Sequence, residues 1–253
     1  MAAVSLIPVP GLPLVRANDD LAELIGAALA RNALPLADGD VVAVAQKIVS
    51  KAEGRVVRLA TVTPSARARA IAEEVGKDPR LVELILSESR AVVRTAPNVL
   101  IVEHKLGFVM ANAGVDQSNV TADGGEAALL LPLDPDASAA RLKTALEKRH
   151  ARRLATIVTD SFGRPWRNGV VGVCLGAAGI PALRDRRGAP DLFGRPLRVT
   201  EIAVGDEIAA AASLLMGAAD ERIPVVIVRG LALEGPDVPA AALIRDRAHD
   251  LFR

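Results

Sequence analysis

Three mainly apolar runs lie along the chain, at Val41–Ala45, Leu154–Thr159 and Pro224–Arg229. Each is short and rich in β-branched residues, and polar or turn-forming residues flank it, so each predicts a buried strand. A fourth short strand is expected at Val4–Val9, directly before a turn of alternating Pro and Gly.

Other segments carry apolar residues at helical spacing. Between Leu21 and Leu29 the apolar positions recur every three or four residues. A helix is therefore expected to begin near Asp20, with Asn18 or Asp19 as its N-cap. Further helices are expected at Pro64–Val75, at Asp78–Ser89, from a cap at Asp136 or Ser138 to about Arg149, and at Glu207–Met216.

Several strands follow one another without an intervening helix. Ala91–Arg94, Val99–Glu103 and Gly107–Ala111 predict a meander of three short strands, and Arg198–Val204 is also strand-like. This irregular alternation favours an α+β fold with mixed or antiparallel sheets over a doubly wound sheet. The chain has no repeat and no long linker, so residues 1–253 are expected to form a single domain, or two interlocked subdomains.

Composition excludes several classes of protein. Hydrophobic residues make up 51% of the 253 positions and the net charge is only +1, which excludes a disordered chain. Cys174 is the only cysteine, which excludes a disulfide scaffold and fits a reducing compartment. Aromatic residues make up only 2% of the chain, and nucleic-acid binding usually needs a basic surface and stacking rings, so no nucleic-acid partner is expected.

No segment predicts a membrane span. The longest nearly uncharged run near the middle of the chain, Val170–Leu183, is shorter than the roughly 20 apolar residues that a bilayer requires, and glycines and a proline interrupt it. The first basic side chain is Arg16, so the N-terminus does not resemble a secretion signal. A cytoplasmic location without a membrane partner is therefore expected.

Several familiar catalytic and nucleotide-binding motifs are absent from the sequence. There is no P-loop motif and no G-x-G-x-x-G after a strand, and no G-x-S-x-G nucleophile elbow. The three histidines are too far apart in sequence for a zinc motif. The histidines and Cys174, which has no neighbouring charge to activate it, are interpreted as core residues. Candidate chemistry therefore lies in the loops after strands.

The strongest local signal is Asp160, which directly follows the apolar run Leu154–Thr159, with Ser161 beside it. A carboxylate at the end of a strand has a rigid base and a head that faces solvent. Oxygen ligands of this kind suit Mg²⁺ or Mn²⁺, and Arg164 and Arg167 add cations for phosphate or carboxylate groups. The alternative is a turn in which Asp160 bonds backbone amides and the arginines are surface charges.

A second candidate is Asp116, in the polar loop that follows the predicted meander. It is either a metal ligand or the first residue of an Asx turn, and Asn119 either caps that turn or bonds a ligand. Lys51 follows a buried strand through a polar step, from which it can reach a phosphate, although most lysines are simply solvated.

A set of segments in this order resembles the coenzyme F420-0:L-glutamate ligases, the γ-glutamyl ligases of deazaflavin coenzyme biosynthesis. The resemblance covers nearly the whole chain, and the block through Gly169 is its most specific part. The segments are Pro10–Pro13, Asp19–Leu21, Ser50–Gly54, Ala113–Asp116, Ser118–Val120, Leu131–Pro132, Asp134–Ser138, Thr159–Gly169 and Thr200–Val204.

The resemblance implies a GTP-dependent ligase that adds glutamate through γ-linkages to coenzyme F420-0. It implies an unusual α+β fold that forms an intertwined homodimer, two Mg²⁺ or Mn²⁺ ions, and K⁺ as a further candidate ion. Some family members carry a C-terminal flavin-binding reductase domain, which is not expected here because the chain ends at Arg253.

The resemblance also implies roles for single residues. Asp116, Asp160 and Ser161 correspond to metal ligands. Lys51, Arg164 and Arg167 are the candidates for charge stabilisation and substrate binding. The residues that correspond to nucleotide contacts are Leu12, Pro13, Leu14, Val15, Gln46, Lys47, Lys51, Asn119, Met216 and Gly217.

Three positions depart from the family pattern, and one of them is Gly205, which replaces the usual Ala before Asp206 and Glu207. Gln46 stands where Ser is common, and Ala218 stands where archaeal relatives carry a metal-binding Gln. Because Ala has no side-chain oxygen, the second metal is expected to have fewer protein ligands, with water or phosphate completing its shell. Two alternatives to the ligase stay open: a related nucleotide-dependent amide ligase with another acceptor, and a catalytically silent nucleotide-binding homologue.

Overall fold

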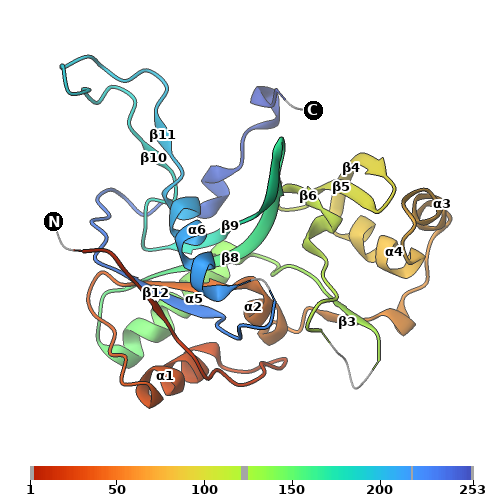
Figure 1. The fold of residues 1–253 in the computed structure, drawn as a ribbon, viewed down its shortest axis with the longest axis horizontal. Coiled ribbons are helices and arrows are strands. Elements are labelled where there is room, and N and C mark those ends of the chain that lie inside the picture. The colour runs from red at the N-terminus through yellow and green to blue at the C-terminus, as the bar shows by residue number, and fades with distance from the viewer. Residues whose placement is uncertain (1–2, 121–124, 218, 252–253) are drawn as a thin grey trace.

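A five-stranded sheet with the order β1-β12-β2-β8-β9 forms the centre of the computed structural model, which describes residues 3–120, 125–217 and 219–251 (Figure 1). Its central strands β2 and β8 run parallel, and every other neighbouring pair is antiparallel. The strands are β1 (Ser5–Pro8), β2 (Val41–Ala45), β8 (Ala155–Arg164), β9 (Arg167–Ala178) and β12 (Val225–Arg229).

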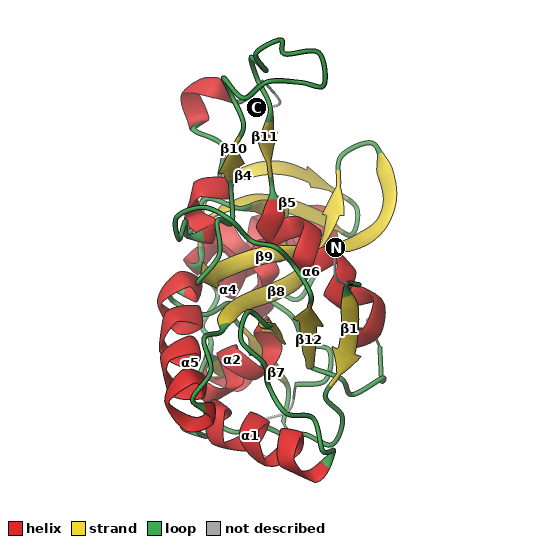
Figure 2. Cartoon of the chain, turned by 90° about the vertical axis from the view of Figure 1, so that its left-hand side faces the viewer, coloured by secondary structure: helices red, strands yellow, loops and turns green. Residues whose placement is uncertain are grey.

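Helices cover both faces of this sheet, because residues of β2 and β12 alternate between two buried layers. One face packs against α1 (Leu21–Arg31), α2 (Gln46–Ala52) and α5 (Pro135–His150), and Figure 2 shows α5 running beside β8 and β9. The other face packs against α6 (Val204–Met216). The core is almost entirely aliphatic, as the composition requires.

Two glycines of β9 let the helices approach the sheet closely. A methyl group at Gly176 would lie 2.1 Å from the carbonyl oxygen of Pro135, at the start of α5. A methyl group at Gly172 would lie 2.3 Å from the carbonyl oxygen of Ala209 in α6. No side chain fits at either place. The glycine-rich run that follows Arg167 is therefore a strand that packs closely between α5 and α6.

A second lobe with its own hydrophobic core lies to the right in Figure 1. Its helices are α3 (Ala66–Val75) and α4 (Pro79–Ser87), and its antiparallel sheet contains β4 (Ser89–Ala96), β5 (Val99–His104) and β6 (Val109–Ala111). A two-stranded ladder of β3 (Val56–Arg58) and β7 (Ala127–Leu129) connects it to the central sheet. Short 3₁₀ turns lie at Leu59–Thr61, Asn112–Gly114, Ala240–Leu243 and Arg247–His249.

An arm projects from the opposite side of the molecule, at the upper left of Figure 1. Its base is a short ladder of β10 (Arg184–Asp185) and β11 (Glu201–Ile202). The loop between these strands exposes Leu192 and Phe193 to solvent.

The structure confirms the α+β class and most of the expected elements. The predicted strand at Arg198–Val204 is wrong in extent, because only Glu201–Ile202 pairs with another strand. The helix caps also differ. Asp20 rather than Asn18 or Asp19 caps α1, and Asp134 rather than Asp136 or Ser138 caps α5, each by accepting a backbone N–H of the first turn.

Two larger corrections concern the candidate site. The polar step expected after β2 is a helix, α2, which begins at Gln46 without a capping side chain. The strand expected to end before Asp160 continues to Arg164 and forms a long hairpin with β9. None of the helices within the described ranges is long and apolar enough to cross a bilayer.

Candidate active site

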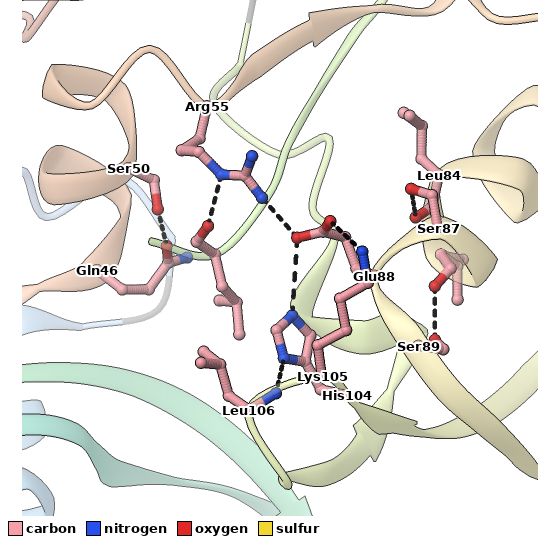
Figure 3. A network of polar contacts seen from close by, with 12 residues as sticks. Gln46, Ser50, Arg55, Leu84, Ser87, Glu88, Ser89, His104, Lys105 and Leu106 are labelled. Carbon is pink, nitrogen blue, oxygen red and sulfur yellow. Dashed lines mark hydrogen bonds and ion pairs between the residues drawn. The ribbon is translucent and has the colours of Figure 1, made fainter. Parts of the chain in front are cut away.

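The site begins where β2 passes directly into α2. β2 and β8 are parallel, and Ala45 pairs with Thr159. The residues that follow this pair, Gln46 at the start of α2 and Asp160 in β8, therefore lie side by side. The Gln46 side chain is buried, and it lies close enough to Asp160 to lower the pKa of that carboxyl. Its carbonyl oxygen accepts the Ser50 hydroxyl at 2.8 Å (Figure 3). Ser50 therefore holds the Gln46 side chain beside Asp160.

Asp160 lies inside β8 and not at a strand end, so that part of the sequence prediction is wrong, while its side chain is partly exposed. Burial raises the pKa of Asp160 to about 6, although the Ser161 N–H, Lys47 and Gln46 act in the opposite direction. A partly buried carboxylate of this kind gains from a nearby cation, because the cation favours its ionised form.

Asp116 lies in the loop after β6, where its backbone exchanges two hydrogen bonds with Leu129. Its carboxylate accepts Lys47 Nζ at 2.6 Å and both the N–H and the hydroxyl of Ser118. Burial alone would raise the pKa of Asp116, but these donors hold it below its usual value. The Ser118 bonds form the Asx turn that was the alternative interpretation, and Asp116 also faces Asp160 closely enough to affect its pKa.

Lys51 and Asn119 join two further segments to this cluster. Lys51 Nζ donates to the carbonyl oxygen of Asn119 at 2.9 Å, and burial together with Lys47 lowers the pKa of Lys51. The amide of Asn119 donates to the carbonyl oxygen of Ala219 at 3.3 Å. The chain that follows Met216 and Gly217 therefore reaches the Asp116 loop. Ala218, the position of the expected missing metal ligand, lies outside the described residues.

Ser161 lies on the other face of β8 from Asp160, because side chains alternate along a strand. It pairs with Gly172, where a side chain would point toward α6. Asp160 pairs with Val173, which packs against the opposite layer. Met216 and Gly217 end α6 on the Ser161 side. The candidate site therefore straddles β8, with Asp160 and Asp116 toward α2 and Ser161 toward α6.

The first predicted nucleotide turn lies next to α2. Asn18 donates its N–H to the carbonyl oxygen of Ala52 at the end of that helix, so residues 11–18 pass close by. The four side chains of the turn differ in environment: Val15 is buried in the core, Leu12 packs partly against it, and Pro13 and Leu14 are exposed. A ligand of this turn would contact its backbone and the exposed side chains.

The structure does not bring Arg164 and Arg167 to the carboxylates. They pair with each other at the tip of the β8–β9 hairpin. At about 3.3 Å per residue, Arg164 is about 13 Å along the strand from Asp160. One guanidinium nitrogen of Arg164 is buried and has no hydrogen-bond partner among the described residues. Phe162, between Asp160 and the tip, packs edge-to-face on Phe108 with ring centroids 5.8 Å apart.

The donor set fits a hard divalent cation. Among the described residues, no three His, Cys, Asp or Glu side chains converge, so a soft or all-protein metal cage has no support. Asp116 and Asp160 supply carboxylate oxygens on the α2 side of β8, and Ser161 supplies a hydroxyl on the α6 side, so each side offers a sparse oxygen set that Mg²⁺ or Mn²⁺ accepts when water or phosphate completes the shell. The ammonium of Lys47, 2.6 Å from the Asp116 carboxylate, already places one positive charge where a metal cation would bind.

Sequence reasoning missed two contacts of this site. Gln46 and Lys47 were expected as nucleotide contacts. In the structure Gln46 lies beside Asp160, and Lys47 forms an ion pair with Asp116. The parallel register of β2 and β8 is the signal that would have placed Gln46 beside Asp160, and it is not readable from either strand alone.

Two carboxylates, two lysines and a buried amide at the junction of two parallel strands define a candidate site for a divalent cation and a phosphate-bearing ligand. Residues 11–230 match the family model described as F420-0:Gamma-glutamyl ligase. The chain belongs to the F420-0:gamma-glutamyl ligase family.

Relatives named "Coenzyme F420:L-glutamate ligase" match almost the full length of the chain. The protein of Methanothermobacter thermautotrophicus is 49% identical, and the alignment covers 99% of each chain. That of Methanopyrus kandleri is 48% identical over 97% of this chain and 96% of its own. That of Archaeoglobus fulgidus is 46% identical over 99% of this chain and 96% of its own.

Proposed function

We propose that the protein is a GTP- and divalent-metal-dependent ligase that adds L-glutamate through γ-linkages to coenzyme F420-0. The observation that carries the proposal is the cluster of Asp116, Lys47, Asp160 and Gln46, found in a chain 49% identical to a protein named coenzyme F420:L-glutamate ligase. The name of the relative supports the substrates, and the cluster supports the use of metal and phosphate.

The proposed reaction has two steps. A carboxylate oxygen of the precursor attacks the γ-phosphorus of GTP, GDP leaves, and an acyl phosphate forms. The amine of glutamate then attacks the acyl carbon, the carbon–oxygen bond to phosphate breaks, phosphate leaves, and the amine nitrogen loses a proton. Positioning and electrostatics supply most of the rate in reactions of this kind.

The chain's own residues have separable roles in this proposal. Asp116, Asp160 and Ser161 would hold the divalent ions, which neutralise charge on the phosphate oxygens when bound. Gln46 lies beside the Asp160 carboxylate and favours its ionised form. Lys47 and Lys51 hold positive charge at the mouth of the same cluster, where the phosphates of the nucleotide would lie.

Arg164 and Arg167 would bind a carboxylate of glutamate or the phosphate of the precursor. Because they lie about 13 Å along β8 from Asp160, they would bind the far end of a long substrate, or serve the partner copy of a homodimer. The homodimer, the use of K⁺ and the cytoplasmic location belong to the same proposal.

The proposal is tested by incubating the protein with GTP, Mn²⁺, L-glutamate and the deazaflavin precursor. A rise in precursor mass by glutamate units supports the ligase. Turnover with another acceptor only, or nucleotide binding without any turnover, contradicts it and favours one of the two alternatives.

Asp160→Asn tests the role of the Asp160 carboxylate within that assay. The variant should lose activity and keep the wild-type circular dichroism spectrum, because the amide of Asn fits the same space but carries no charge to hold the cation. Near-normal turnover by a folded Asp160→Asn protein would show that Asp160 does not bind the metal.

A further inference from the structure

Arg55 lies just beyond α2 and connects that helix to two other parts of the molecule (Figure 3). Its Nε donates to the carbonyl oxygen of Leu131 at 2.9 Å, and its Nη2 donates to the carboxylate of Glu88 at 2.5 Å. Its backbone N–H donates to the carbonyl oxygen of Ser50 in α2 at 2.9 Å, and its own carbonyl oxygen accepts the N–H of Leu130 at 3.1 Å. One residue thus holds α2, the 129–131 segment and the end of α4 together.

The 129–131 segment leads directly to the candidate site. Asp116 and Leu129 exchange two backbone hydrogen bonds, at 3.0 and 2.8 Å. A continuous series of backbone hydrogen bonds therefore runs from Ser50 through Arg55 and residues 129–131 to Asp116, and the Arg55 side chain braces this series by its bonds to Leu131 and Glu88. Its two ends are the helix that carries Lys47 and Lys51 and the loop that carries Asp116.

The surroundings of Arg55 make this connection rigid. The Arg55 and Glu88 side chains are only 17% and 12% exposed. Lys105 Nζ lies 3.7 Å from the other oxygen of Glu88. The imidazole of His104 lies 3.8 Å from Glu88 and accepts the Leu106 N–H at Nδ1. A planar guanidinium that bonds a carbonyl and a carboxylate at once fixes direction as well as distance.

We propose that Arg55 is a positioning residue that sets the separation between the α2 lysines and Asp116. This inference rests on the proposed function, because it takes Asp116 as a cation ligand. Besides the β3–β7 ladder, which pairs Val56 with Leu129, the gap is crossed directly by Lys47 to Asp116 and Ser118 and by Lys51 to Asn119. A cation bound at Asp116 competes with Lys47 for the same carboxylate, so that connection weakens when the site is loaded, whereas the Arg55 bonds do not depend on it.

The test compares Arg55→Met, Arg55→Lys and a matched control, Arg229→Met. Arg229 also pairs with a buried carboxylate, Asp40, at 2.6 Å, but at the far end of β2 from Gln46. Mn²⁺ affinity is measured by electron paramagnetic resonance without substrates, together with kcat and the melting temperature.

Arg55→Met should weaken Mn²⁺ binding and lower kcat, each by about tenfold or more, as displaced supporting contacts do at metal sites. Arg55→Lys keeps the charge but cannot bond Leu131 and Glu88 together in one plane. It should recover the melting temperature and keep most of the loss in Mn²⁺ affinity and kcat. Arg229→Met should lose stability and keep both site properties.

Equal losses of stability in Arg55→Met and Arg229→Met, with Mn²⁺ affinity and kcat unchanged in both, would overturn the inference. If Arg55→Met does not fold, Arg55→Lys decides: wild-type Mn²⁺ affinity and kcat would overturn it. A wild-type protein that binds Mn²⁺ but adds no glutamate would refute the proposed activity, and the Mn²⁺ comparison would still test Arg55. A wild-type protein that does neither overturns both.

Discussion

His104 should make the stability of the protein fall as the pH drops below about 6.5. Its side chain is buried at the end of β5, in the second lobe. Nδ1 accepts the Leu106 N–H, so the neutral imidazole fits the site. Burial, together with the charges of Lys105, Arg55 and Arg90, lowers the pKa of His104 to about 4 from its ordinary 6.5. Glu88 would favour the protonated form, but Arg55 already pairs with that carboxylate at 2.5 Å.

The sign and size of the effect follow from proton linkage. Between pH 6.5 and about 4 the unfolded chain binds a proton at His104 and the folded chain does not, so acid favours unfolding. At about 1.4 kcal/mol per pH unit the complete effect is about 3 kcal/mol, and about 2 kcal/mol of it has developed at pH 5. Stability from this residue is complete above pH 6.5.

The assay is urea denaturation of the wild type and His104→Asn from pH 7.5 to 4.5 at one protein concentration. The Asn side chain keeps an acceptor for the Leu106 N–H but does not titrate. Asp160, whose pKa burial raises to about 6, titrates in the same range with the opposite sign, so only the difference between the two proteins isolates His104. A difference that stays constant within about 0.5 kcal/mol from pH 7 to 5 would refute a buried neutral imidazole.

Three further predictions concern the hairpin and its surroundings. Gly176→Ala should cost about 1–3 kcal/mol in urea denaturation, because its methyl group would lie 2.1 Å from the carbonyl oxygen of Pro135, whereas Gly163→Ala, with open space around it, should cost much less. Cys174, 2% exposed and with its pKa raised by burial, should react with a thiol reagent only after the chain unfolds; rapid labelling of the native protein would contradict this. Arg167→Ala should raise the KM for glutamate or the precursor more than that for GTP, and a change in the GTP value alone would refute the assignment.

The sequence predicted best the elements whose signal is local. Val41–Ala45 is apolar throughout and the run before Asp160 is mainly apolar because both faces of the sheet are covered, and such runs are typical of buried strands. The α2 helix was missed because it has only seven residues and its N-cap, Ala45, offers no capping side chain. The extension of β8 past Asp160 was missed because polar and glycine residues replace the apolar run where the hairpin leaves the sheet.

The candidate site was predictable as a set of residues but not as a geometry. Asp116, Asp160, Lys51 and Asn119 were each expected from local patterns, and the structure gathers them. The Lys47–Asp116 contact depends on how the second lobe docks against α2, which no local pattern encodes. Likewise, the β8–β9 register is needed to show which layer Asp160 faces and which layer Ser161 faces.

The position of β12 also determines when the sheet can be completed during synthesis. β1 and β2 lie within residues 5–45, yet each pairs with β12, at residues 225–229. Until that late segment leaves the ribosome, β1 has no neighbour and one edge of β2 is open to pairing with other nascent chains. Contacts of such long sequence separation also form slowly. The strand that leads into Gln46 therefore reaches its final setting only near the end of translation, and chaperone protection of its open edge would matter most before then.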